Sequence, residues 1–152
     1  MASPSQSVKN AIFTILVVDD KPVNLRVVFE ALREEGYRVL VAEDGASALR
    51  QATKVKPDMV LLDIMMPKLS GFEVCKAVKD DPATREIMIL MVTALNELGD
   101  IERAVNAGCD DFLSKPVNKI ELLKRVENML KLRSIKDELQ RLREYIDGMD
   151  ER

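Results

Sequence analysis

Five short runs of continuous apolar residues constrain the fold of this sequence more than any other feature. The runs are FTILVV (13–18), YRVLVA (37–42), MVLLD (59–63), IMILMVT (87–93) and DFLS (111–114). Between and after them, apolar residues recur at helical spacing over about 22–35, 45–55, 71–79, 97–107 and from 118 onward. Runs without polar alternation are typical of strands that are covered on both faces. The pattern predicts an α/β fold, a doubly wound five-stranded parallel sheet with right-handed crossovers.

Polar residues stand where four of these predicted strands end. Asp19 and Asp20 follow the first strand, Asp63 ends the third, Thr93 ends the fourth and Lys115 follows the fifth. In a doubly wound sheet, ligands bind beyond the carboxyl ends of the strands, at a topological switch point. Three carboxylates, one hydroxyl and one ammonium are therefore expected to converge on one edge of the sheet.

Three neighbouring aspartates repel one another, so either their pKa values rise or a divalent cation binds them. The chain contains no histidine, and its two cysteines, Cys75 and Cys109, lie far apart without metal-ligand spacing. We interpret both cysteines as small apolar core residues. Any metal must then be bound by oxygen, which favours Mg²⁺ or Mn²⁺. The lack of histidine also excludes Ser-His nucleophiles and histidine general bases.

Asp63 is the candidate nucleophile of this group. A carboxylate beside such a metal can attack phosphorus and form an acyl phosphate. Lys115 would pair with the phosphoryl oxygens as a point charge, and Thr93 could donate its hydroxyl to the same group. The residues together predict phosphoryl chemistry at the edge of the sheet.

The ordered motifs at four strand ends resemble those of response-regulator receiver domains, the CheY-like superfamily of two-component signalling. They are VVDD (17–20), LLDIMMPKLSGFEV (61–74), MVTA (91–94) and AGCDDFLSKP (107–116). The resemblance covers about residues 12–130, which we expect to form the receiver domain. It implies a flavodoxin-like (βα)5 fold in which Asp63 accepts phosphate from a histidine kinase or a phosphotransfer protein.

The same resemblance implies roles for individual residues. It implies these Mg²⁺ ligands: Asp20 and Asp63 directly, Asp19 through water, and the backbone carbonyl of Met65. Thr93 would move toward the phosphoryl group, and Phe112 would change rotamer with it. The family also implies a cis peptide bond between Lys115 and Pro116.

Three positions depart from choices that are common in such domains. Met65 lies two residues after the acceptor and Leu95 two residues after Thr93, where the side chains flank the approach of the hydrolytic water. Apolar side chains cannot orient that water, so we expect a long-lived phosphoaspartate. Phe112 replaces the more usual tyrosine, which leaves switching by ring burial but removes a phenolic hydroxyl.

Some of these acids also have a plain structural interpretation. Asp19 and Asp20 could cap the helix that begins near Pro22, although Asp63 and Lys115 in register argue against this. A second acidic pair, Asp110-Asp111, precedes a strand. We expect it to form surface ion pairs, with Arg125 as a candidate partner.

Three functions compete for this set of residues. The first is a phosphorylated switch that relays a conformational change to the C-terminal helix. The second is a Mg²⁺-dependent phosphatase or phosphotransferase with an aspartyl-phosphate intermediate. Haloacid-dehalogenase-like enzymes of this kind need an acid where this chain has Met65. We therefore expect no enzymatic turnover beyond the chain's own aspartyl phosphorylation and dephosphorylation. The third is a phosphorylation-independent dimeric adaptor, which the complete set of Asp20, Asp63, Thr93 and Lys115 disfavours.

Residues 131–152 form a different kind of segment, in which twelve of 22 residues are charged. Six apolar residues recur at spacings of 3, 4, 3, 4 and 3: Leu132, Ile135, Leu139, Leu142, Ile146 and Met149. We call this set the seam. Its spacing is that of a coiled coil. We expect one long helix that forms a homodimer and leads toward an output domain that this sequence lacks. Folding of the seam back onto the domain is the alternative.

The remaining features limit location and partners. Residues 1–11 have the composition of a disordered leader, and no apolar run is long enough to span a bilayer. The net charge of −3 gives no basic field for nucleic acid. We expect a cytoplasmic protein that binds neither membrane nor nucleic acid directly.

Overall fold

The computed structural model of the chain describes residues 13–94 and 98–150. The expected leader at 1–11 and Leu95 lie outside the described residues. The elements in chain order are β1 (Thr14–Val18), α2 (Pro22–Glu34), β2 (Arg38–Ala42), α3 (Gly45–Val55), β3 (Met59–Asp63), α4 (Gly71–Asp80), β4 (Met88–Thr93), α5 (Leu98–Asn106), β5 (Asp111–Ser114) and α6 (Lys119–Asp150).

The five strands form one parallel sheet in the order β2-β1-β3-β4-β5. This is the flavodoxin-like order, and it confirms the predicted fold. The chain winds outward from β1 in one direction to β2 and in the other through β3 to β5. The switch point therefore lies between β1 and β3, which are the strands that end in aspartates.

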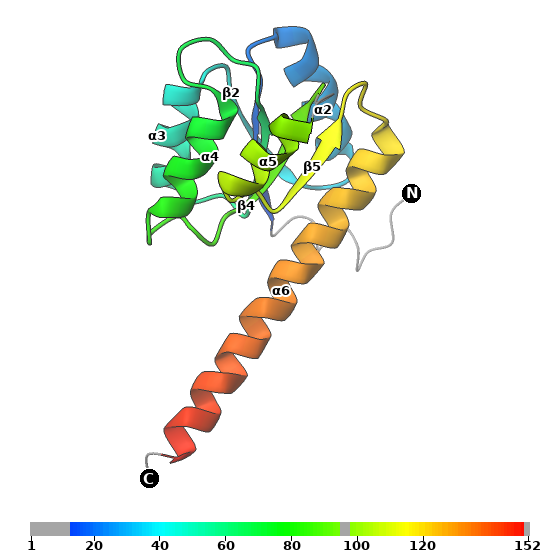
Figure 1. Cartoon of the computed structure of the whole chain (residues 1–152). Helices are drawn as coiled ribbons and strands as arrows, with labels where there is room; N and C mark the ends of the chain where they lie inside the picture. The colour runs from blue at the N-terminus through cyan, green and yellow to red at the C-terminus, as the bar shows by residue number, and fades with distance from the viewer. Residues whose placement is uncertain (1–12, 95–97, 151–152) are drawn as a thin grey trace.

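The helices cover both faces of the sheet (Figure 1). Helices α3, α4 and α5 pack on one face with Leu16 and Val18, whereas α2 and α6 pack on the other with Ile15 and Val17. Successive residues of each central strand thus enter opposite cores, as the two-residue period of a strand requires. This two-sided burial is why the strands read as continuous apolar runs.

Local sequence signals place the helix that follows the acceptor strand. The Ser70 hydroxyl accepts a hydrogen bond from the backbone N–H of Glu73, and the Glu73 carboxylate accepts one from the N–H of Ser70, both at 3.3 Å. This capping box satisfies two donors at the helix start. It fixes the point at which the loop after Asp63 enters α4.

Gly71 allows this loop to close against the acceptor strand. A Cβ atom at Gly71 would lie 2.5 Å from the backbone oxygen of Asp63 and 2.7 Å from Cα of Ile64. We expect Gly71→Ala to lower the free energy of unfolding by about 2 kcal/mol, because backbone rather than a side chain must move. Urea denaturation measures this change.

Gly148 provides the control for that substitution. It lies in α6 with nothing within 4 Å of an added Cβ. Gly148→Ala should stabilise the helix by about 0.5–1 kcal/mol, because alanine loses less backbone entropy there. Equal effects of the two substitutions would show that the contact with the Asp63 strand does not matter.

Helix α6 is a single continuous helix of 32 residues, which confirms the predicted long helix. Its first turns pack on the sheet through Leu122, Val126, Met129 and Leu130. Beyond them the helix projects away from the domain (Figure 1). The six seam side chains are 48–56% exposed, so they do not fold back onto the domain. Among the described residues, no helix is both long and apolar enough to cross a membrane.

One ion pair joins the projecting helix to the sheet. Arg133 Nη1 lies 2.7 Å from Asp58 Oδ1, and the second carboxylate oxygen of Asp58 accepts a 2.7 Å hydrogen bond from the N–H of Thr14. Both charged side chains are less than one-third exposed. Asp58 precedes β3 directly, so this contact ties α6 to the strand that carries Asp63.

Candidate functional site

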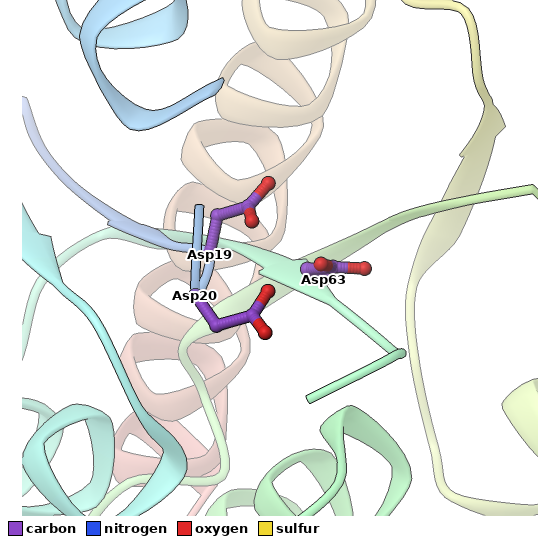
Figure 2. Close-up of side chains that lie close together, drawn as sticks. All are labelled: Asp19, Asp20 and Asp63. Atoms are coloured by element: carbon purple, nitrogen blue, oxygen red, sulfur yellow. The ribbon is translucent and has the colours of Figure 1, made fainter. Parts of the chain in front are cut away.

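The ends of β1 and β3 bring three carboxylates together. Asp19, Asp20 and Asp63 each offer an oxygen within 4.8 Å of the others (Figure 2). Asp19 is 7% exposed and Asp63 is 4% exposed, whereas Asp20 is less deeply buried. This confirms the prediction that the three carboxylates converge on one edge of the sheet.

The position of Asp19 does not fit a helix cap. Its Oδ1 accepts a 2.9 Å hydrogen bond from the N–H of Lys21, and Lys21 itself occupies the N-cap position of α2. No side-chain hydrogen bond caps this helix. Pro22 at the helix start needs no such partner for its nitrogen. The aspartate pair is thus oriented toward Asp63 instead of toward the helix.

Lys115 contributes the one ammonium group of the described site. Its Nζ lies 3.6 Å from Asp63 Oδ2 and 3.6 Å from Asp19 Oδ2. Its N–H donates to the carbonyl oxygen of Thr93 at 2.9 Å, which fixes the start of the loop after β5. The peptide bond between Lys115 and Pro116 is cis, as the resemblance implies. One ammonium beside three carboxylates leaves the cluster with excess negative charge.

Several neighbours act on the Asp63 carboxyl group. Burial raises its pKa above the ordinary value, and the Asp19 carboxylate raises it further. The Lys115 ammonium and a hydrogen bond from the N–H of Met65 oppose this rise. The Met65 bond spans 3.2 Å to Asp63 Oδ1. Burial and repulsion dominate, so the ionised form of Asp63 is disfavoured. A bound cation would stabilise that form.

The donor set fits a magnesium ion. Asp20 Oδ1 is buried and has no hydrogen-bond partner among the described residues. A buried carboxylate oxygen without a donor is unfavourable, so its place beside Asp19 and Asp63 is suited to binding a cation. Carboxylate oxygens in small number, with room for water, suit Mg²⁺. The role of the Met65 carbonyl as a further ligand stays a prediction.

The two predicted switch residues lie on neighbouring strands. Thr93 is 2% exposed at the end of β4, in register with Ser114 of β5. Phe112 is half-buried and packs against the core on the face of α4 and α5. Their positions connect the acidic edge to that face of the sheet. The predicted movements of Thr93 and Phe112 remain predictions.

The second acidic pair forms ion pairs away from the site, as expected. Asp111 pairs with Arg125 at 2.8 Å, and Asp110 pairs with Lys79 at 2.9 Å. Both acids lie at the amino end of β5, whereas the acidic cluster lies at the carboxyl ends of β1 and β3. Lys79, which also donates to the carbonyl oxygen of Ile87 at 2.7 Å, is not among the predicted ion-pair partners. No sequence signal distinguishes it from other helix lysines.

The cysteines behave as apolar residues. Cys75 is fully buried, and burial raises the pKa of its thiol to about 12. Cys109 is half-buried, and burial raises its thiol pKa as well. Thiolate is the reactive and metal-binding form, so neither residue is suited to redox or metal chemistry.

Comparison with known sequences identifies the family. The family model described as "Response regulator receiver domain" matches residues 15–127 of this chain. The response regulator PleD of Caulobacter vibrioides is 43% identical over 126 residues, which are 83% of this chain and 28% of PleD. RpaA of Synechocystis, a DNA-binding transcriptional regulator, is 38% identical over 77% of this chain and 48% of its own length. The chain thus spans less than half of either relative.

For shorter relatives and for solved structures, the match with this chain covers nearly the whole length of the other protein. DivK of Brucella anthropi is 32% identical, with 95% of its length matched. Vibrio cholerae CheY4 has a TM-score of 0.74 at 33% identity over 78% of this chain and 98% of that chain. The PA1611 receiver domain of Pseudomonas aeruginosa, solved with magnesium coordinated in its active-site cleft, has a TM-score of 0.73 at 34% identity over 78% and 98% of the chains. This chain therefore belongs to the response-regulator receiver domain family.

Proposed function

We propose that this receiver domain accepts a phosphoryl group on Asp63 from a phosphohistidine of a histidine kinase or phosphotransfer protein in the cytoplasm. The observation that carries the proposal is a buried carboxylate, Asp63, held 3.6 Å from the Lys115 ammonium beside two further carboxylates. An Asp63 oxygen attacks phosphorus, the P–N bond to the donor imidazole breaks, and the imidazole leaves with the bonding electrons and takes up a proton. The product is an acyl phosphate.

The other residues of the site would stabilise the transferred group. Asp19, Asp20 and Asp63 would hold Mg²⁺, which supplies positive charge for the phosphoryl oxygens. Lys115 pairs with one of those oxygens, and the Thr93 hydroxyl donates to another. The charge added at Asp63 gives the two states of the switch different interaction energies with these groups, as any population shift requires.

Intact-mass spectrometry tests the phosphoacceptor. After incubation with acetyl phosphate and Mg²⁺, we expect a species heavier by one HPO₃ unit. The species should be absent when a chelator replaces Mg²⁺. A folded protein that binds Mg²⁺ but gains no adduct would contradict the proposal and favour the phosphorylation-independent adaptor.

We propose that the adduct is long-lived. The Met65 side chain is 74% exposed at the edge of the site and offers no group that orients water toward the phosphoryl group. The predicted half-life of the adduct in Mg²⁺ buffer is minutes or longer. Intact-mass spectrometry at successive times after removal of the phosphodonor measures it. Met65→Asn should shorten it several-fold, while the exposed-surface control Val105→Asn should not. A wild-type half-life of seconds would contradict this expectation.

We further propose that α6 relays the switch and forms a parallel homodimer through the seam. The exposed seam supports dimerisation, because a stripe of six half-exposed apolar side chains on a lone helix is unfavourable in water. With Leu132 at heptad position a, Glu138 at g of one copy faces Arg143 at e of the other in a parallel pair, although Lys131 and Lys136 repel. An antiparallel pair would set two basic e positions, Lys136 and Arg143, against each other.

The domain boundaries follow from this proposal. Residues 12–130 would form the receiver domain, and residues 131–152 would form a coiled-coil linker toward an output domain. PleD and RpaA are both much longer than the part that matches this chain. The ion pair of Asp58 with Arg133 would make the start of the linker rigid, so a change at β3 could move the helix as a lever.

A further inference from the structure

A small cavity lies behind the acidic site, between α2 and the face of the sheet that α2 covers. Its volume is about 20 Å³. Its walls are mostly apolar side chains of β1, β3 and β4, together with Val28 of α2. Among the residues that the structure describes, three polar ones line it: Asp19, Asp63 and Asn24. Asn24 is the polar residue of this cavity that has no role in the phosphoacceptor site described above.

Asn24 lies on the side of α2 that packs on the sheet. Leu25, Val28 and Leu32 belong to the apolar core on this side or pack against it. Asn24 and Val28 are one helical turn apart, so they lie one above the other on the helix, and both line the cavity. Asn24 is half-buried, whereas Val23 beside it is exposed. A polar residue thus stands where helix packing alone would favour another apolar one.

Helix capping does not account for this asparagine. The N-cap residue of α2 is Lys21, and no side-chain hydrogen bond caps the helix. The carboxamide of Asn24 forms no hydrogen bond with another residue that the structure describes. Its N–H groups and its oxygen are therefore available to a partner in the cavity.

We propose that Asn24 is a positioning residue of the phosphoacceptor site, and that it acts through one water molecule bound in the cavity between its carboxamide and the carboxylates of Asp19 and Asp63. The inference rests on the function proposed above. A cavity of roughly 10–15 Å³ is large enough for one water molecule when polar groups line it, and this cavity exceeds that size. The apolar remainder of the wall restricts the water to these three polar partners.

Both carboxylates can accept a hydrogen bond from this water. Asp19 accepts one from the N–H of Lys21 at 2.9 Å. Asp63 accepts one from the N–H of Met65 at 3.2 Å. A carboxylate offers about four lone-pair positions, so each acid has room for a further donor. The water would donate one hydrogen to each acid and accept one hydrogen bond from the amide of Asn24.

This arrangement would orient two of the acids that are suited to hold magnesium. Asp19 and Asp63 belong to the cluster of three carboxylates at the strand ends. Groups that hydrogen-bond to ligating carboxylates orient them, and loss of such a group typically weakens metal binding or activity by about 10- to 100-fold. Asn24 would act on the site through the water and would not itself contact the reacting atoms.

Mg²⁺ titration followed by amide NMR would compare the wild type with Asn24→Leu, Asn24→Ser and the control Asn106→Leu. Leucine is similar to asparagine in size but forms no hydrogen bond, whereas serine keeps a hydroxyl for the water. Asn106 is exposed at the end of α5. We expect the dissociation constant of Mg²⁺ to rise about tenfold for Asn24→Leu, to rise much less for Asn24→Ser, and to stay unchanged for the control. A merely structural role would instead lower the midpoint of urea denaturation, which Asn24→Leu should not do.

High-resolution crystal structures of the metal-free wild type and of Asn24→Leu would test for the water directly. We expect a water within hydrogen-bond distance of Asn24 and of both acids in the wild type, and none in the variant. An unchanged Mg²⁺ dissociation constant for Asn24→Leu, or a wild-type cavity without water, would overturn the inference. A wild type that binds no Mg²⁺ would overturn it together with the proposed magnesium site. These measurements need no phosphodonor, so they decide on Asn24 separately from adduct formation on Asp63.

Discussion

Asp63→Asn should abolish the phosphoryl adduct completely and, in metal-free buffer, raise the free energy of unfolding. The amide nitrogen and oxygen cannot form the acyl phosphate that a carboxylate forms. The same change removes a buried negative charge that Asp19 repels, and burial together with that repulsion already raises the pKa of the Asp63 carboxyl. The loss of the adduct and the gain in stability thus both follow from removal of the Asp63 carboxylate.

The stability gain should be about 1 kcal/mol, since Lys115 still has Asp19 as a partner at 3.6 Å. Urea denaturation with a chelator measures it, and Mg²⁺ should then stabilise the variant less than the wild type. Asp137→Asn, an exposed acid on α6, is the control and should change neither property. An adduct on Asp63→Asn, or a variant less stable than the wild type without metal, would contradict the account.

Leu139→Asp should eliminate dimerisation. Leu139 lies at the middle of the seam, at position a, so the substitution would place two like charges against each other in an apolar interface. We expect the dissociation constant to rise by about a thousandfold or more, as light scattering would show. The side chain is 56% exposed in one copy, so folding of the single domain should hardly change.

Gln140→Asp is the matched control for the seam. It adds the same charge one residue later, at position b, on the exposed side of α6. It should leave the dimer intact. Equal loss in both variants would point to a charge effect on the whole helix instead of a seam. A wild type that is monomeric at high concentration would contradict the dimer directly.

Much of the fold could be predicted because both faces of the sheet are buried. The run MVLLD predicted β3 at residues 59–63, and the structure has Met59–Asp63. The other strands differ by at most one residue at their start, as with YRVLVA (37–42) against Arg38–Ala42. Tyr37 is buried although it does not belong to the strand. Apolar runs in the sequence are therefore slightly longer than the strands they predict.

The acidic edge could also be predicted, because parallel strands bring their carboxyl ends to one side. The contacts that join distant segments could not. Asp58 and Arg133 are separated by 75 residues and carry no local signal for their ion pair. Such features follow from tertiary packing, whereas periodicity and strand ends are properties of short segments.

Borohydride reduction of the phosphorylated protein would show which residue carries the phosphoryl group. Hydride converts an aspartyl phosphate to homoserine and releases phosphate, so peptide mass mapping identifies the residue that carried the group. We predict homoserine at position 63, formed only after incubation with phosphodonor and Mg²⁺. Homoserine at Asp19 or Asp20, or no homoserine from a protein that shows the mass adduct, would contradict it.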